Sequence, residues 1–227
     1  MSTFFKYTLG IFLLSLPALL HSQQRYDYNA EAGFDSPVFR GEIVQRYPFP
    51  FTGTVYAYSD EFEMGDLEFN GKMYYGLMMN LNSHKGELYV RIGETKDYIA
   101  LKNSLVGDFN IGERRYTTLF GERGIKGLAP GYYQMLYEGK DMILKQIDRK
   151  IYDHTDFSSG NITKAFALKV KYWLVKDGMV KQIRRERDLQ RVYRSFKKDI
   201  RSYMSVHSEV DMDINLEFIM SMVEGRQ

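Results

Sequence analysis

The stretch LEFNGKMYYGLMM, residues 67–79, indicates most clearly how the chain folds. Asn70-Gly71 is a residue pair favoured at the centre of a type I′ turn, because both central positions of that turn need a positive φ angle. The segments on either side, residues 67–69 and 73–79, are rich in aromatic and apolar residues. The stretch therefore predicts two antiparallel strands joined by a tight hairpin turn.

Similar short segments, bounded by glycine, asparagine or proline, continue along the chain on both sides of this hairpin. They lie at residues 53–58, 88–92, 98–101, 115–120, 132–137, 142–147, 166–175 and 179–183. The last two flank Asp177-Gly178, a second turn signal of the same kind. This spacing predicts a mainly β fold of the α+β class, built as an antiparallel meander, a sandwich or a partly closed barrel.

The periodicity changes after Arg184. Apolar residues recur at steps of three and four from Leu189 to Tyr203, which predicts an amphipathic helix broken once near Ser195. A last helix should begin at Asp211 or Asp213, whose carboxylate can cap exposed backbone N–H groups. We expect its buried stripe to consist of Phe218, Ile219, Met222 and Val223. The expected organisation is an antiparallel β domain over residues 37–184 and a helical tail over residues 185–227 packed on it.

The N-terminus has the features of a cleavable signal peptide over residues 1–22. Lys6 is the only charged residue before an apolar run at residues 9–20, and that run is shorter than the ~20 residues needed to span a bilayer. Pro17 and Ser22 suit the end of the run and the cleavage position. Residues 23–36 follow as a loose polar leader. The sequence therefore predicts an exported protein, periplasmic or extracellular, with an uncleaved anchor or a buried core helix as the alternatives.

The chain contains no cysteine. This excludes disulfides, thiolate metal sites, a cysteine nucleophile and the lipid-accepting cysteine of a bacterial lipoprotein. The glycine-rich segment at residues 121–127 lacks the spacing of a phosphate-binding loop. The acidic group at residues 60–68 alternates with Phe62, Met64 and Leu67, as on the solvated face of a strand, and lacks the ligand order of a calcium loop. We therefore expect no cofactor and no metal.

His154 lies between Asp153 and Asp156 and is the first candidate for chemistry. Imidazole beside two carboxylates can shuttle a proton or coordinate a divalent cation, which would suit a hydrolase. The alternative is a solvated connection before the hairpin at residues 166–183, because Asp, Thr, Ser, Gly and Asn favour turns. The alternative is the simpler interpretation of residues 153–159.

Residues 181–201 carry the strongest charge feature, with nine cations against three acids. Export argues against nucleic acid as a partner. The candidate ligands are anionic lipid headgroups, lipopolysaccharide or an acidic partner, which Arg187, Arg191, Arg194 and Lys198 would hold. The alternative is an exposed helix face that the acidic residues at 209–217 partly balance.

The chain is rich in aromatic residues, with eighteen Tyr and fifteen Phe but one Trp. Flat rings can stack on sugars, although Tyr and Phe in strands mostly pack across strands. Packing is the expected role of most of these rings.

Several turn and strand signatures together resemble a broad set of uncharacterised, exported, β-rich proteins of Bacteroidota. These signatures are Phe39-Arg40-Gly41, Asn70-Gly71-Lys72, Pro130-Gly131-Tyr132-Tyr133, Leu136-Tyr137-Glu138-Gly139-Lys140 and Lys176-Asp177-Gly178. The resemblance implies a β-rich envelope protein and supplies no catalytic residue. We expect a non-enzymatic binding or assembly module, with a partner in the cell envelope. A hydrolase centred on His154 and a peripheral binder of anionic lipid or lipopolysaccharide are the alternatives.

Overall fold

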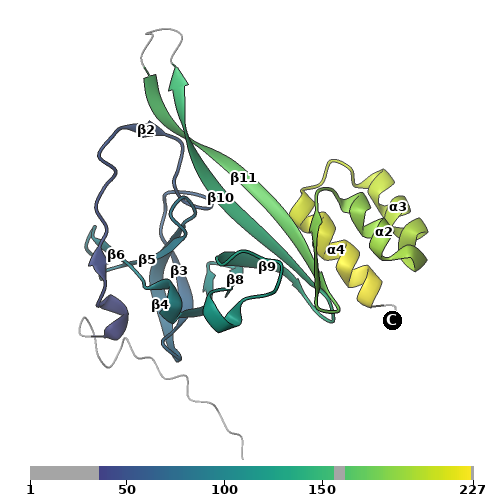
Figure 1. Ribbon diagram of the computed structural model, residues 1–227, viewed down its shortest axis with the longest axis horizontal. Coiled ribbons are helices and arrows are strands. Elements are labelled where there is room, and N and C mark those ends of the chain that lie inside the picture. Colours follow the sequence, from purple (N-terminus) through teal and green to yellow (C-terminus); the bar gives the residue numbers. More distant parts are fainter. Residues whose placement is uncertain (1–35, 156–161, 226–227) are drawn as a thin grey trace, which may run out of the picture.

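A computed structural model describes residues 36–155 and 162–225. They form a 12-stranded, mostly antiparallel open sheet followed by three α-helices (Figure 1). The strands are β1 (Glu42–Ile43), β2 (Phe51–Thr52), β3 (Glu63–Phe69), β4 (Lys72–Asn82), β5 (Glu87–Arg91), β6 (Tyr98–Ala100), β7 (Val106–Ile111), β8 (Arg114–Thr118), β9 (Tyr132–Glu138), β10 (Met142–Thr155), β11 (Ile162–Lys176) and β12 (Met179–Ile183). The helices are α2 (Leu189–Val192), α3 (Lys197–Val206) and α4 (Met212–Glu224). The prediction of a mainly β fold with a helical tail is confirmed.

Two antiparallel runs of strands share β3 and make up the sheet. One run passes through β4, β5 and β6 and ends on β1, and the other passes from β7 through to β12. Among the strands of the described residues, only β2 pairs in parallel, with β11. Of the predicted architectures, the described pairings show the meander.

Both predicted hairpin turns form. Asn70 and Gly71 join β3 to β4 with φ angles of 51° and 72°, and Asp177 and Gly178 join β11 to β12 with φ angles of 49° and 72°. The positive φ at both positions is what the Asn-Gly and Asp-Gly pairs indicate.

Two segments differ from the sequence-based expectation. Residues 53–58 form no named strand and contribute a single bridge, between Tyr56 and Asn82. Strand β7, which was not predicted, lies in the middle of the sheet between β3 and β8. Its exposed or half-buried Asp108 and Asn110 alternate with buried apolar residues, so its apolar content is low although one face is covered.

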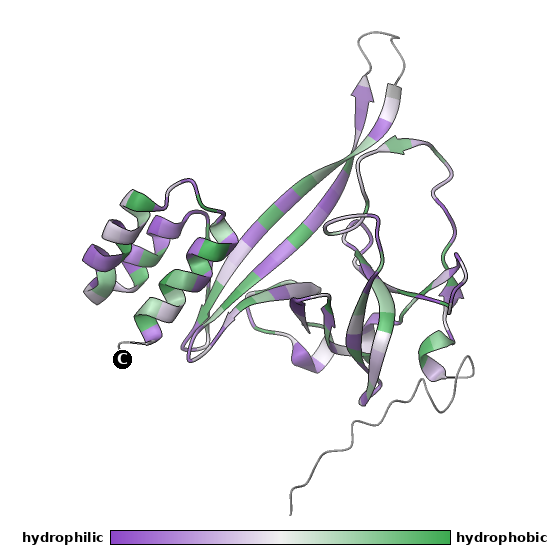
Figure 2. Ribbon diagram, turned by 180° about the vertical axis from the view of Figure 1, so that it is seen from behind, coloured by the Kyte–Doolittle hydropathy of each residue, from purple (hydrophilic) through white to green (hydrophobic). Residues whose placement is uncertain are grey.

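Strands β10 and β11 form a long ribbon that links the sheet to the helical tail (Figure 1). They pair along all of β10, whereas β9 pairs with only the first four residues of β10, Met142 to Lys145. Beyond that point the ribbon is largely two-stranded and its residues 150–155 are exposed. Figure 2 shows hydrophilic and hydrophobic residues alternating along it.

The helical tail packs on the base of this ribbon. The apolar face of the tail meets Ile143, Leu174 and Ile183 in one buried cluster. The predicted helix break is present, because the chain leaves α2 at Tyr193 and passes through the 3₁₀ turn Arg194–Phe196 before α3.

The buried stripe of α4 is rotated from the predicted one. Leu216, Ile219, Met220 and Val223 are fully buried, whereas the side chain of Phe218 is 49% exposed and stacks on Tyr203. The prediction was wrong for Phe218. Asp211 caps the helix as expected, accepting a hydrogen bond from the Asp213 backbone N–H at 2.7 Å.

Polar contacts at both ends of α4 attach the tail to the sheet. At its start, Asp213 pairs with Lys145 Nζ at 2.5 Å and accepts a hydrogen bond from the Tyr172 hydroxyl at 2.8 Å. At its end, the Glu224 carboxylate accepts the backbone N–H groups of Lys140 and Asp141 at 3.0 and 2.9 Å. The last helix thus caps the turn between β9 and β10.

Lys145 is a nearly buried cation at this junction. Burial favours a lower pKa, but hydrogen bonds with Asp213 and Tyr58 favour a higher one, and the net pKa of Lys145 lies above its ordinary value.

Across residues 36–155 and 162–225, we find no helix that is both long and apolar enough to cross a membrane.

Candidate functional site

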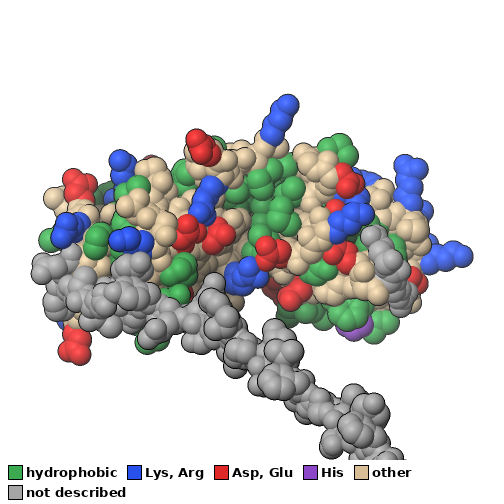
Figure 3. Space-filling view, turned by 90° about the horizontal axis from the view of Figure 1, so that it is seen from below, with side chains coloured by type: hydrophobic (Ala, Val, Ile, Leu, Met, Phe, Trp, Pro, Cys, Tyr) green, Lys and Arg blue, Asp and Glu red, His purple; other side chains and the backbone are tan. Residues whose placement is uncertain are grey.

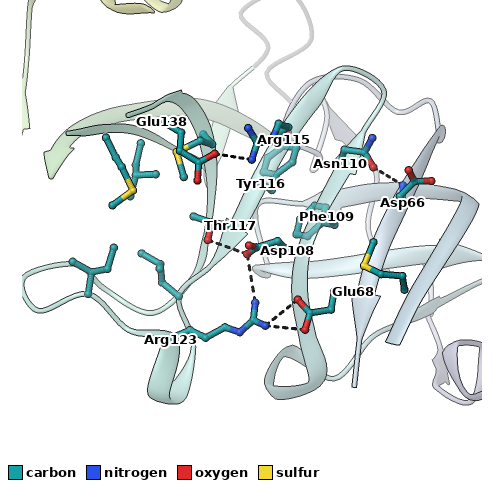
Figure 4. Close-up of a pocket in the computed structure, with 16 residues that line it drawn as sticks. Asp66, Glu68, Asp108, Phe109, Asn110, Arg115, Tyr116, Thr117, Arg123 and Glu138 are labelled. Carbon is teal, nitrogen blue, oxygen red and sulfur yellow. Dashed lines mark hydrogen bonds and ion pairs between the residues drawn. The ribbon is translucent and has the colours of Figure 1, made fainter. Parts of the chain in front are cut away.

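A pocket of about 530 Å³ lies on the solvent-facing side of the sheet, over β3, β7 and β8 (Figure 4). Alternate residues of a strand point to one face, and this rule brings Asp66 and Glu68 of β3 beside Asp108 of β7 and Thr117 of β8. Met135 and Met142 contribute apolar lining. The acidic group seen in the sequence is therefore, in part, one wall of this pocket.

The charged groups of this pocket are largely paired with one another, as Figure 4 shows. Arg123 Nη2 lies 2.9 Å from both carboxylate oxygens of Glu68, and this hydrogen bonding raises the pKa of Arg123. Arg123 Nη1 also lies 3.4 Å from Asp108, and Arg115 pairs with Glu138 at 2.8 Å. Both cations that line the pocket are in ion pairs, so it offers no unpaired cation to an anionic ligand.

A second concavity, the cationic depression, lies on the helical tail and has a volume of about 690 Å³. Its lining residues are Arg187, Gln190, Arg191, Arg194 and Lys197. They come from a 3₁₀ turn, from α2, from the next 3₁₀ turn and from the first residue of α3. The helix break after Val192 lets these short elements turn about a common hollow.

Three of the four predicted ligand residues, Arg187, Arg191 and Arg194, therefore meet at one place. The fourth, Lys198, does not line the depression, and Lys197 takes that position instead. Successive helical residues are about 100° apart around the axis, so neighbouring lysines of α3 point in different directions. The charge run contains all four cations that line the depression, but it carried no signal that distinguished the two lysines.

Little negative charge balances the cationic depression. Arg191 lies 3.5 Å from Asp188, but its side chain is 72% exposed, so this ion pair is weak. Within the described ranges, the side chains of Arg187, Arg194 and Lys197 have no ion pair or hydrogen bond. Figure 3 shows Lys and Arg side chains projecting from the right-hand end of the molecule, where Figure 1 places the helical tail.

The segment around His154 is arranged differently from the sequence-based interpretation. Strand β10 continues through Thr155, so Asp153 and His154 lie within the ribbon rather than in a loop. Both side chains are exposed, and Asp153 forms an ion pair with Lys164 across the ribbon. Asp156 lies outside the described residues. In the part of the chain that is described, no three His, Asp or Glu side chains gather as a metal site.

The chain matches no family model, no curated protein and no solved structure in the comparisons with known proteins. Its resemblance to exported proteins of Bacteroidota therefore stays a prediction.

Proposed function

We propose that this protein is an exported, non-enzymatic binding module of the cell envelope, which holds phosphate groups of lipopolysaccharide or anionic lipids in the cationic depression. The observation that carries the proposal is the convergence of Arg187, Arg191, Arg194 and Lys197 on one hollow with almost no internal counter-charge. By contrast, the arginines of the sheet pocket are in ion pairs.

The chemistry of the lining suits a phosphate. Arginine presents a planar fork of donors that matches phosphate oxygens, and three of the four cations here are arginines. Like charges gathered in one concave surface also focus the electrostatic field on it. An anion carrying more than one phosphate would replace the mutual repulsion of these cations with attraction.

We propose that the helical tail binds the membrane by electrostatic attraction to anionic headgroups rather than by inserting apolar residues into the lipid. Val206 is the most exposed large apolar residue of α3, at 77%. It follows Lys197 by nine positions, which at about 100° per residue places it on the opposite side of the helix. Val206 and the cationic depression therefore cannot contact the same membrane surface at the same time. Binding should consequently weaken steeply with salt.

The export part of the proposal rests on the signal features of residues 1–22. Because the chain has no cysteine, a lipid anchor on cysteine cannot hold it at the membrane, and reversible contact with headgroups is the mode of attachment that remains in this proposal. The non-enzymatic part rests on the exposed setting of His154, whose neighbour Asp153 is in an ion pair with Lys164.

The test is co-sedimentation of the chain lacking residues 1–22 with phosphatidylcholine vesicles, with and without phosphatidylglycerol or lipopolysaccharide. One variant replaces the four lining cations with serine: Arg187→Ser, Arg191→Ser, Arg194→Ser and Lys197→Ser. The matched control loses the same charge from exposed cations outside the depression: Lys181→Ser, Arg184→Ser, Lys198→Ser and Arg201→Ser.

At about 1 kcal/mol for each cation near an anionic surface, the depression variant should lose roughly a thousandfold in affinity. The control should lose clearly less, because its cations do not converge. Equal losses in the two variants would mean that only net charge matters. Absence of binding by the unmodified chain at low salt would refute the proposal outright.

A further inference from the structure

A third concavity, the aromatic pocket, lies on the sheet side of the molecule and has a volume of about 350 Å³. Residues 44–51 form one wall, and strands β4, β5 and β6 contribute the other. Its core lining is Tyr47, Phe51, Tyr56, Asn82, Tyr89 and Tyr98. These residues are spread over more than fifty positions of sequence, so no local motif revealed them.

The rings of this pocket are held in different orientations by contacts with one another. Tyr89 and Tyr98 stack, with centroids 5.3 Å apart and planes at 28°. Tyr47 meets Phe51 edge to face at 5.4 Å, and Tyr56 meets Tyr89 edge to face at 6.2 Å. Rings in such arrangements support one another beyond simple burial. The pocket is thus walled by rigid aromatic surfaces.

A fully buried amide fixes the polar groups at its base. Asn82 Nδ2 donates to the Tyr89 hydroxyl at 3.0 Å and to the Tyr47 hydroxyl at 3.4 Å. Its Oδ1 accepts the backbone N–H groups of His84 and Lys85 at 3.0 and 2.9 Å. Asn82 therefore has its own partners and serves to hold two phenol groups in place.

The base of the pocket carries phenol groups, and the Asp60 side chain also lines the pocket. Burial raises the pKa values of Tyr47, Tyr56 and Tyr89, so these groups stay protonated. The Tyr89 hydroxyl donates to Glu87 at 2.9 Å, whereas the Tyr47 hydroxyl accepts from Asn82 and has its own proton to donate. Polar side chains stand at the rim, where Gln45 and Arg46 are exposed and make no side-chain hydrogen bond within the described residues. Ring surfaces, phenol groups and one carboxylate thus lie in the same small space.

We propose that the aromatic pocket binds a pyranose ring of a neutral glycan. A sugar ring presents an apolar C–H face to aromatic surfaces and hydroxyl groups at its edge to phenols and amides. A purely apolar ligand would strip water from the phenol groups without replacing their hydrogen bonds, which is unfavourable. A few convergent polar groups in a mostly aromatic cavity are also what ligand sites generally contain. This site is separate from the cationic depression and does not depend on it.

The experiment is saturation-transfer NMR of the chain lacking residues 1–22 with maltohexaose, cellohexaose and mannohexaose, followed by titration calorimetry with any sugar that responds. Tyr47→Ala removes a ring from the wall, and Tyr47→Phe keeps that ring. The matched control is Tyr152→Ala, which removes an exposed ring at the outer part of the ribbon. Gln45→Ala alters an exposed rim residue and leaves the core untouched.

We expect transfer to ring protons of at least one hexasaccharide. Tyr47→Ala should weaken binding about tenfold, Tyr47→Phe and Gln45→Ala by less, and Tyr152→Ala not measurably. Fluorescence of Trp173, which lies in a different cluster, reports whether each variant is folded. Absence of transfer to all three sugars would overturn the proposal. The proposal would also be overturned if folded Tyr47→Ala bound the sugar as tightly as the unmodified protein does. Binding of the phenol p-cresol without binding of any of the three sugars would overturn it as well.

Discussion

Replacing Asp213 with asparagine should weaken the attachment of the helical tail, because Asp213 is the charged partner of Lys145. The lysine side chain is only 9% exposed and the aspartate 25%. Asp213 also accepts the Tyr172 hydroxyl at 2.8 Å. Without the carboxylate, a nearly buried ammonium group would lose its counter-charge while keeping its desolvation cost.

The size of the effect follows from this burial. Removing one partner of a fully buried ion pair costs about 3–5 kcal/mol, whereas exposed pairs contribute about 0–1 kcal/mol. This pair lies closer to the buried case, and the asparagine oxygen can still accept one hydrogen bond. We therefore expect the free energy of unfolding to fall by about 2–3 kcal/mol, equivalent to roughly 4–12 °C in Tm for a chain of this size.

The loss should also depend on pH. In the unmodified protein the pKa of Lys145 is raised above its ordinary 10.5, so its contribution to stability is complete below pH 10.5 and is lost as pH rises through the folded-state value. In Asp213→Asn, burial dominates and the pKa of Lys145 falls below 10.5. The difference in stability between the two proteins should therefore be largest near neutral pH. It should narrow as pH rises, first through the lowered pKa of Lys145 in the variant and then through the raised pKa in the unmodified protein.

The assay is urea unfolding followed by fluorescence of Trp173, the single tryptophan. The control is Glu217→Gln, which removes the same charge from an exposed position of the same helix and should change stability by less than about 0.5 kcal/mol. The double variant of Asp213→Asn with Lys145→Met has no unpaired charge, so its cost should be smaller than the sum of the two single costs. Equal costs for Asp213→Asn and Glu217→Gln, or strict additivity in the double variant, would refute the reasoning.

Three further predictions concern packing and titration. A Cβ at Gly65 would overlap the backbone carbonyl oxygen of Asn110 in the neighbouring strand β7, whereas a Cβ at Gly71 would meet no atom. In chemical unfolding, Gly65→Ala should therefore lower the free energy of unfolding by more than about 3 kcal/mol and Gly71→Ala by about 1 kcal/mol. Leu216→Ala empties fully buried space and should cost about 2–5 kcal/mol, whereas Phe218→Ser should cost about 1 kcal/mol or less in thermal unfolding. Because burial raises the pKa of many tyrosines, their phenols should ionise only well above pH 10 in absorbance titrations, and stability should fall as pH rises past 10.

Local signals predicted those elements of the fold in which one face is buried and turn chemistry is specific. The Asn70-Gly71 and Asp177-Gly178 turns are of this kind. Local sequence signals do not determine how far a strand extends into solvent. The apolar pattern of β10 stops at Ile147, but the strand runs on to Thr155 because β11 supplies its hydrogen bonds. Residues 53–58 show the reverse error, since their apolar side chains fill the core without joining a ladder.

The candidate site was predictable in composition but not in geometry. The charge run identified the region of the cationic depression, whereas the choice of Lys197 over Lys198 depends on how α3 leaves the break after Val192. Contacts between distant residues had no sequence signal at all. Glu224 caps a turn more than eighty residues earlier, and Asn82 organises phenols from two separate segments.

The order of synthesis gives the packing of α4 a further consequence. The apolar cluster at the base of the ribbon is completed by α4, a 13-residue helix that follows every described strand along the chain. Until α4 is made, Ile143, Leu174 and Ile183 are covered only by the elements of the tail before it. They lie near the edge strand β12, and exposed apolar surface beside a strand edge promotes aggregation. A chain cut before Met212 should therefore collect in the insoluble fraction even though it contains every described strand of the sheet.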